Sequence, residues 1–260
     1  MTVSLADRLA GKNAPPLIVA EMSGNHNGSL DRALALVDAA AKAGAHALKI
    51  QTYTADTMTI DSRKPGFVID DPESLWSGRN LYELYEEAHT PWAWHAPIFD
   101  RCKQHGMLGF SAPFDPTAVD FLESLDVELY KIASFEIVDI PLIKKVAATG
   151  KPLIMSTGMS SLDEIGEAVE AAKSVGNEQI ILLKCTSTYP APPDATHVSA
   201  VATLAETFGV MAGLSDHTHG IGVALASIAF GACVIEKHFT LSRADGGVDS
   251  AFSLEPAELK

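Results

Sequence analysis

The sequence is poor in several features that mark particular classes of protein. It has three cysteines in 260 residues, Cys102, Cys185 and Cys233, and their spacing matches no metal-binding cluster. So few cysteines, in an odd number, in a chain long enough for a large core are typical of a reducing compartment. The first sixteen residues lack the basic start and apolar run of a signal peptide. These absences together predict a cytoplasmic protein.

Basic residues and long apolar runs are also scarce. The chain has 19 Lys and Arg against 33 Asp and Glu, a net charge of −14, and contains no basic run. We therefore expect no nucleic-acid partner. The apolar runs are too short to span a bilayer, so no membrane partner is expected either. An anionic substrate stays possible, because a few lysines can set the local field.

Short apolar segments alternate with helical segments along the chain. Parallel strands buried on both faces appear as such apolar runs, and the repeat of strand and helix predicts a (β/α)₈ TIM barrel. A doubly wound sheet is the structural alternative. The first six predicted strands cover 17–21, 47–52, 107–111, 129–134, 152–157 and 180–186, and the last two lie within 211–240.

Three departures from this regular pattern stand out. Residues 1–16 are expected to be an N-terminal extension, with the barrel domain covering 17–260. The long excursion 53–89 contains an aromatic cluster and is expected to be functional, with a stabilising lid as the alternative. The eighth helix, 256–260, is barely one turn. We therefore expect the native chain to continue or a partner to cover the gap.

The stretch 211–240 carries two histidines, each at the end of a predicted strand. It consists of a strand, a small apolar helix and a second strand, which places two parallel strands in one sheet. His217 lies at the end of the first strand and His238 at the end of the second. Neighbouring strands lie about 4.8 Å apart, so the two imidazoles are predicted to converge on one metal ion. Two unrelated histidines are the alternative.

Polar side chains gather at the other predicted strand ends, the usual site of chemistry in a barrel. Buried charges need partners, so these groups form either a mutual ion-pair network or a site for a charged ligand. Lysines and hydroxyls suit phosphate oxygens, and two histidines with oxygen ligands suit Mn²⁺ or a similar Lewis acid. A phosphate pocket beside such a metal predicts carbon–carbon bond formation from a phosphorylated enol. The residues include Glu21, Lys49, Gln51, Lys131, Ser134, Glu136, Ser156, Ser187, Tyr189, Ser215 and Glu236.

Several stretches together form a specific pattern. They are AEMSGNHN (20–27), ALKIQTYTADTMTID (47–61), LWSGRNLYELYEEAHTPWAWH (75–95), FSAPFD (110–115), YKIASFEIVD (130–139), GKPLIMSTGM (150–159), LLKCTSTYPAP (182–192), GLSDHTHG (213–220) and EKHFTLSRADGGVDSAFSLEP (236–256). In these stretches the chain resembles the sialic acid synthase family. Within it, EMSGNHN, LWSG and DSAFSLEP are most similar to the branch that makes pseudaminic acid.

The resemblance implies a transferase. Phosphoenolpyruvate would condense with a 2,4-diacetamido-2,4,6-trideoxy hexose, and C–O cleavage would release phosphate and a nine-carbon 2-keto acid. It implies that His217 and His238 hold Mn²⁺ or Mg²⁺, which polarises the aldehyde, and that Glu21 lies near the reacting carbons. The implied phosphoenolpyruvate-binding residues are Lys49, Lys131, Ser134, Ser156, Ser187 and Ser215. The implied sugar-binding residues are Gln51, Glu136, Tyr189, Glu236 and Asp249.

Other interpretations stay open at this point. The sugar acid could instead be N-acetylneuraminate or legionaminate. A Schiff-base aldolase would use Lys49, Lys131 or Lys184 as nucleophile. A metal-dependent hydrolase is less favoured, because further ligand histidines are missing. Members of the family also carry an antifreeze-like domain after the barrel, to which nothing in these residues corresponds. A catalytically incomplete, sugar-binding barrel is therefore a further alternative, and a homodimer is expected of the full-length form.

Overall fold

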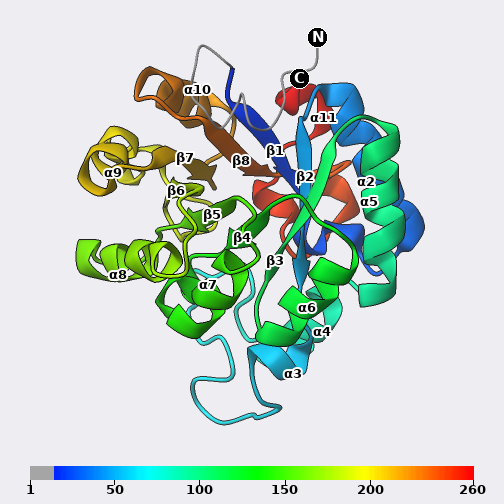
Figure 1. Cartoon of the computed structure of the whole chain (residues 1–260). Coiled ribbons are helices and arrows are strands. Elements are labelled where there is room, and N and C mark those ends of the chain that lie inside the picture. Colours follow the sequence, from blue (N-terminus) through cyan, green and yellow to red (C-terminus); the bar gives the residue numbers. More distant parts are fainter. Residues whose placement is uncertain (1–14) are drawn as a thin grey trace.

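Parallel strands close into a barrel in the order in which they occur in the sequence (Figure 1). The computed structural model describes residues 15–260, so the predicted extension lies outside the described residues up to residue 14. Within the described part, β8 pairs with β1 and closes the ring. The strands are β1 (Leu17–Glu21), β2 (Ala47–Thr52), β3 (Leu108–Pro113), β4 (Tyr130–Ile132), β5 (Leu153–Ser156), β6 (Ile180–Cys185), β7 (Met211–Asp216) and β8 (Val234–His238). The predicted barrel is confirmed, and the doubly wound alternative is wrong because such a sheet keeps two open edges.

Helices surround the barrel and connect successive strands. The α-helices are α2 (Leu30–Ala43), α3 (Ala55–Met58), α4 (Leu81–Ala88), α5 (His95–Gln104), α6 (Pro116–Ser124), α7 (Ile140–Ala147), α8 (Leu162–Lys173), α9 (Ala200–Phe208), α10 (Gly222–Ala229) and α11 (Pro256–Leu259). Short 3₁₀ helices include η1 (Ser23–His26), η2 (Trp92–Trp94), η3 (Phe135–Val138) and η6 (Ser250–Phe252). None of the helices in residues 15–260 has both the length and the apolar character needed to cross a membrane.

Local capping chemistry explains most helix boundaries. The hydroxyl of Ser29 accepts a hydrogen bond from the backbone N–H of Arg32 at the start of α2. Gly44 ends α2 with φ 98°, a conformation that costs glycine little. Ser161 and Glu164 form a capping box at the start of α8.

One predicted helix start is wrong. The sequence Thr90-Pro91 predicts a helix from that point, but Pro91 has an extended ψ of 133° and α5 begins only at His95. The intervening turn η2 places the indole of Trp92 against Phe121 of α6, with ring centroids 4.6 Å apart and nearly parallel. Packing between two helices has therefore overridden the local signal.

The last element is short, as expected. α11 covers four residues and lies beside α2 in Figure 1. Its Leu259 packs against an apolar cluster that includes Leu36 and Val37 of α2. α11 thus covers one edge of α2, while Leu225 and Ile228 of α10 and the preceding Ile221 stay exposed.

Alternate residues of the strands fill the barrel interior. Side chains in a strand point to opposite faces with a period of two. The inward apolar residues form one buried cluster, to which β1, β2, β3, β5, β6, β8 and the residue before β4 contribute: Leu17, Val19, Ala47, Phe110, Leu129, Ile154, Ile181, Leu183 and Val234. This apolar layer lies directly below the polar residues at the carboxyl ends of the strands.

Candidate functional site at the carboxyl ends of the strands

The next inward position on most strands is polar. Two residues beyond the apolar layer, the strands carry buried side chains that can hold charge or donate hydrogen bonds: Glu21, Lys49, Lys131, Ser156, Cys185 and Glu236. The same alternation places Ser215 at the inward end of β7. Residues far apart in the sequence therefore meet at one mouth, where (β/α)₈ barrels carry their active sites.

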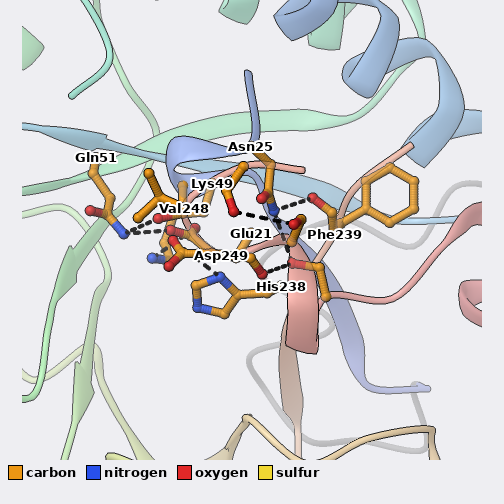
Figure 2. Close-up of polar contacts among 12 residues, drawn as sticks. Glu21, Asn25, Lys49, Gln51, His238, Phe239, Val248 and Asp249 are labelled. Carbon is orange, nitrogen blue, oxygen red and sulfur yellow. Dashed lines mark hydrogen bonds and ion pairs between the residues drawn. The ribbon is translucent and has the colours of Figure 1, made fainter. Parts of the chain in front are cut away.

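Glu21, Lys49 and Glu236 form a buried charged cluster. The Nζ atom of Lys49 lies 2.8 Å from Oε2 of Glu21 and 3.8 Å from Oε1 of Glu236. Gln51 donates to Oε1 of Glu21 at 2.8 Å, and Ser215 donates to Oε1 of Glu236 at 3.2 Å. Figure 2 shows Glu21, Lys49 and Gln51 pointing toward one another, with His238 and Asp249 beside them. These contacts hold two carboxyl groups and one ammonium group in fixed positions at the mouth of the barrel.

The two glutamates of this cluster differ in their pKa. Burial raises the pKa of Glu21, although the neighbouring Lys49 opposes the rise. Burial acts in the same direction on Glu236, but the charges of Lys49 and Lys131 hold the pKa of that carboxyl below its usual value. Carboxyls with divergent pKa values are suited to different acid and base roles.

His217 and His238 lie side by side, as the two strands predict. Their ring centroids are 5.4 Å apart, and the rings meet edge to face. Nδ1 of His217 is 2.9 Å from the carbonyl of Thr186, which orients the ring. Nδ1 of His238 is buried without a hydrogen bond, with Oδ2 of Asp249 at 3.9 Å. Burial and the neighbouring His217 lower the pKa of His238 well below its usual value, so its imidazole is neutral.

This imidazole pair fits a divalent metal ion. A metal binds neutral imidazole, and the buried, unpaired Nδ1 of His238 is a nitrogen without another partner in the described structure. The carbonyl that orients His217 is the kind of outer contact that supports metal-binding histidines. Among residues 15–260, no set of three His, Cys, Asp or Glu side chains is placed to hold a metal. A metal held by this pair would keep positions open for water or substrate.

Lysine and serine side chains line the part of the mouth next to the imidazole pair. Nζ of Lys131 donates to Oγ of Ser156 at 2.7 Å and to the carbonyl of Ile132 at 3.0 Å. Burial lowers the pKa of this lysine. Ser134 accepts a hydrogen bond from the N–H of Gly158 at 3.1 Å.

Gly158 explains how the serine hydroxyls can converge. A Cβ atom at this position would lie 2.2 Å from Oγ of Ser187 and 2.8 Å from Oγ of Ser134. Any side chain would therefore displace both hydroxyls. We call Ser134, Ser156, Ser187 and Lys131 around Gly158 the serine cradle. Its donors match the needs of a phosphate group.

The remaining predicted residues lie around the imidazole pair or on the loops above it. The ring of Tyr189 is 4.3 Å from that of His217. Asp249, on the segment before η6, is buried, and burial raises its pKa. Glu136 lies on η3, where burial raises its pKa to about 7. The structure thus brings all predicted site residues to the same end of the barrel.

Sequence reasoning missed two contributors to this end of the barrel, Gly158 and Cys185. Gly158 follows β5, and its only sequence signal was its place after a predicted strand end. Cys185 faces inward and contacts Ser187 at 3.9 Å between Sγ and Oγ. Contact with His217 lowers the pKa of its thiol to about 7 against the opposing effect of burial. Lys184 points to the other face of β6, where it donates to the carbonyl of Cys185. Trp76, part of the aromatic cluster already noted, approaches Tyr189 with ring centroids 5.9 Å apart.

A closed (β/α)₈ barrel with the serine cradle beside a histidine pair is the arrangement of an enzyme that binds a phosphorylated substrate. The family model described as "NeuB family" matches residues 36–260, and the chain belongs to that family. It is 45% identical over 243 residues to pseudaminic acid synthase of Campylobacter jejuni, a match that covers 94% of this chain and 70% of that protein. The pseudaminic acid synthase of Helicobacter pylori is 44% identical over 241 residues, covering 93% and 70%.

Solved structures agree with this assignment. The N-acetylneuraminic acid (sialic acid) synthetase of Leptospira borgpetersenii, solved in complex with citrate, has a TM-score of 0.85 and 34% identity. The match covers 95% of this chain and 81% of that one. A truncated 3-deoxy-D-arabino-heptulosonate 7-phosphate synthase of Thermotoga maritima has a TM-score of 0.70 at 15% identity, which shows a shared fold alone.

Proposed function

We propose that this chain condenses phosphoenolpyruvate with a 2,4-diacetamido-2,4,6-trideoxy hexose to form pseudaminic acid and phosphate. The observation that carries the proposal is the serine cradle lying beside the imidazole pair, joined to it through Cys185. The 45% identity to a pseudaminic acid synthase supports this sugar over the related N-acetylneuraminate and legionaminate precursors. Phosphoenolpyruvate is a cytoplasmic metabolite, which supports a cytoplasmic enzyme.

The reaction balances as follows. C3 of phosphoenolpyruvate forms a bond to the aldehyde carbon of the open-chain sugar, and the aldehyde oxygen takes up a proton. Water adds at C2, the bond from C2 to the phosphate oxygen breaks, and phosphate leaves. The two protons of the water balance the one on the new hydroxyl and the one that the departing phosphate takes up. The products are the nine-carbon 2-keto acid and inorganic phosphate.

The serine cradle would hold the phosphate. Lys131 and the hydroxyls of Ser134, Ser156 and Ser187 supply donors, and buried donors of this kind bind an anion without reorganising. Lys49 and Ser215 complete the phosphoenolpyruvate side of the site. Glu21, whose pKa burial raises, is placed to exchange a proton near the new bond or to orient water.

His217 and His238 would hold a divalent metal, Mn²⁺ or Mg²⁺. When bound, the metal supplies a Lewis acid for the aldehyde oxygen. Gln51, Glu136, Tyr189, Glu236 and Asp249 would contact the sugar. In this proposal the protein is a homodimer, which the exposed apolar residues Leu225 and Ile228 of α10 support.

The test is product analysis with isotope labelling. The protein is incubated with Mn²⁺, phosphoenolpyruvate labelled with ¹⁸O in the bridging position, and a panel of diacetamido and N-acetyl hexoses. We expect mass spectrometry to detect a nine-carbon keto acid from the trideoxy sugar and the label in released phosphate. Label in the keto acid contradicts C–O cleavage, and product from another sugar alone contradicts the substrate.

Matched variants connect the product to the site. We expect His217→Ala and His238→Ala each to abolish product formation. His105→Ala, which removes a half-exposed histidine at the C-terminal end of α5, should keep it. Borohydride reduction in the presence of substrate should leave the protein mass unchanged. A trapped adduct on Lys49 or Lys131 would instead identify a Schiff-base aldolase.

A further inference from the structure

A second ion pair is buried directly behind the two histidines. Nζ of Lys237 lies 2.8 Å from Oδ2 of Asp216, and the two side chains are 4% and 0% exposed. Asp216 and Lys237 are neighbours in the register of β7 and β8. Each immediately precedes one of the histidines in the sequence. Because strand side chains alternate, the pair lies on the outer face while His238 and Glu236 face the barrel interior.

Lys237 contacts both residues that flank His217. Besides the carboxylate of Asp216, its ammonium group donates to the carbonyl of Thr218 at 2.8 Å. The other carboxylate oxygen of Asp216 accepts the N–H of Thr218 at 2.9 Å. The backbone on either side of His217 is therefore tied to the residue that precedes His238. No other ion pair of the described residues joins the strands that carry the two imidazoles.

Stability alone does not account for this arrangement. Removing a charge pair from water is costly, and well-packed apolar replacements of such pairs are often neutral or stabilising. A buried pair instead fixes the geometry of the strands that carry it, because each charged group has few other hydrogen-bonding partners where water is excluded. A fixed separation of two strand ends is what a two-histidine metal site requires.

We propose that Asp216 and Lys237 are positioning residues that fix the separation and orientation of His217 and His238 for metal binding. The inference rests on the proposed function for the presence of the metal. In this role neither Asp216 nor Lys237 contacts the substrate or the metal. Outer contacts of metal-binding histidines typically change metal affinity by about 10- to 100-fold.

The experiment measures Mn²⁺ binding to metal-free protein by calorimetry, with thermal unfolding alongside. We expect Lys237→Met and Asp216→Asn each to weaken Mn²⁺ binding by about tenfold or more. The decisive variant is the double substitution Asp216→Leu with Lys237→Met, which leaves no unpaired buried charge. It should recover most of the stability lost in Lys237→Met while Mn²⁺ binding stays weak.

Two controls make the result specific. Lys145→Met removes an ion pair of similar length, 2.7 Å to Asp120, between α6 and α7, and should leave Mn²⁺ binding unchanged. Phosphoenolpyruvate binding without metal should be unchanged in all variants, because the serine cradle lies at β4–β6 and Ser215 faces the barrel interior, away from the outward-facing pair.

The outcomes separate the two proposals. A folded double variant that binds Mn²⁺ within twofold of the wild type overturns the positioning role, since the pair would then only stabilise the fold. Wild-type protein that binds no Mn²⁺ overturns the metal-dependent function itself. Recovery of affinity together with stability in the double variant also contradicts the inference.

Discussion

Glu136 shows at the scale of one residue how burial prepares a group for chemistry. It lies on η3 with one carboxylate oxygen buried and without a hydrogen-bond partner in the described structure. Burial is the main cause of its raised pKa, and Lys131 only partly opposes it. A carboxyl that stays protonated near neutrality can donate a hydrogen bond to a sugar hydroxyl or amide oxygen, which a carboxylate cannot.

The raised pKa of Glu136 predicts a pH-dependent stability. A carboxyl with a pKa of 4.5 when unfolded and about 7 when folded binds more protons in the folded protein between these values. Its contribution to the free energy of unfolding is complete below pH 4.5 and is lost as the pH rises to about 7. The loss is up to about 1.4 kcal/mol per pH unit.

We therefore expect Glu136→Gln to flatten the fall in stability over this range, as measured by urea unfolding at several pH values. The exposed Glu128→Gln is the control and should follow the wild-type curve. Parallel curves for wild type and Glu136→Gln would show that the carboxyl is ionised in the folded protein.

The excursion between β2 and α5 acts at the scale of an element. It forms the cyan segment along the lower edge of Figure 1 and includes α3 and α4. Trp76 in this segment donates its indole N–H to the carbonyl of Val248 at 2.8 Å. Its ring approaches Tyr189, which packs on His217. The excursion therefore reaches the imidazole pair as an aromatic wall.

This wall predicts a specific effect on the sugar. Trp76→Ala should raise the KM for the sugar about 2- to 12-fold, the equivalent of about 0.5–1.5 kcal/mol for one aromatic contact. The KM for phosphoenolpyruvate should not change, because the serine cradle lies elsewhere. Trp76→Phe should restore most of the loss, and the neighbouring Leu75→Ala, 47% exposed, is the control. Equal changes in both KM values would mean that the excursion only stabilises the barrel.

The whole molecule combines an acidic exterior with buried ammonium groups. The net charge is −14, yet Lys49 and Lys131 are at most 4% exposed at the centre of the mouth. Converging lysines in a low-dielectric interior attract an anion despite the overall charge. A ligand that binds only the folded protein also stabilises it.

Phosphoenolpyruvate should therefore protect the fold. At 100 times its Kd, a ligand adds about 2.7 kcal/mol, which raises Tm by roughly 5–11 °C in a chain of this size. Lys131→Ala should weaken binding by about 1.5–3 kcal/mol, the worth of a hydrogen bond to a charged group. We expect most of the shift to vanish in this variant at the same ligand concentration, and to persist in the surface variant Lys173→Ala. An undiminished shift in Lys131→Ala would exclude the lysine from the cradle.

The sequence by itself determined the order of strands and helices, most helix ends and the end of the barrel that carries the site. These follow from local causes: the period of apolar residues, capping by Ser29 and Ser161, and the glycines that end helices. The same local rules placed His217 and His238 at neighbouring strand ends.

Only the tertiary structure decided which face of each strand a side chain occupies and what it meets there. It turned Cys185 rather than Lys184 inward, joined Lys237 to Asp216, moved the start of α5 to His95 and brought Ser134 and Ser187 together over Gly158. These features join residues from different elements. They depend on strand register and barrel closure, which no single stretch of sequence contains.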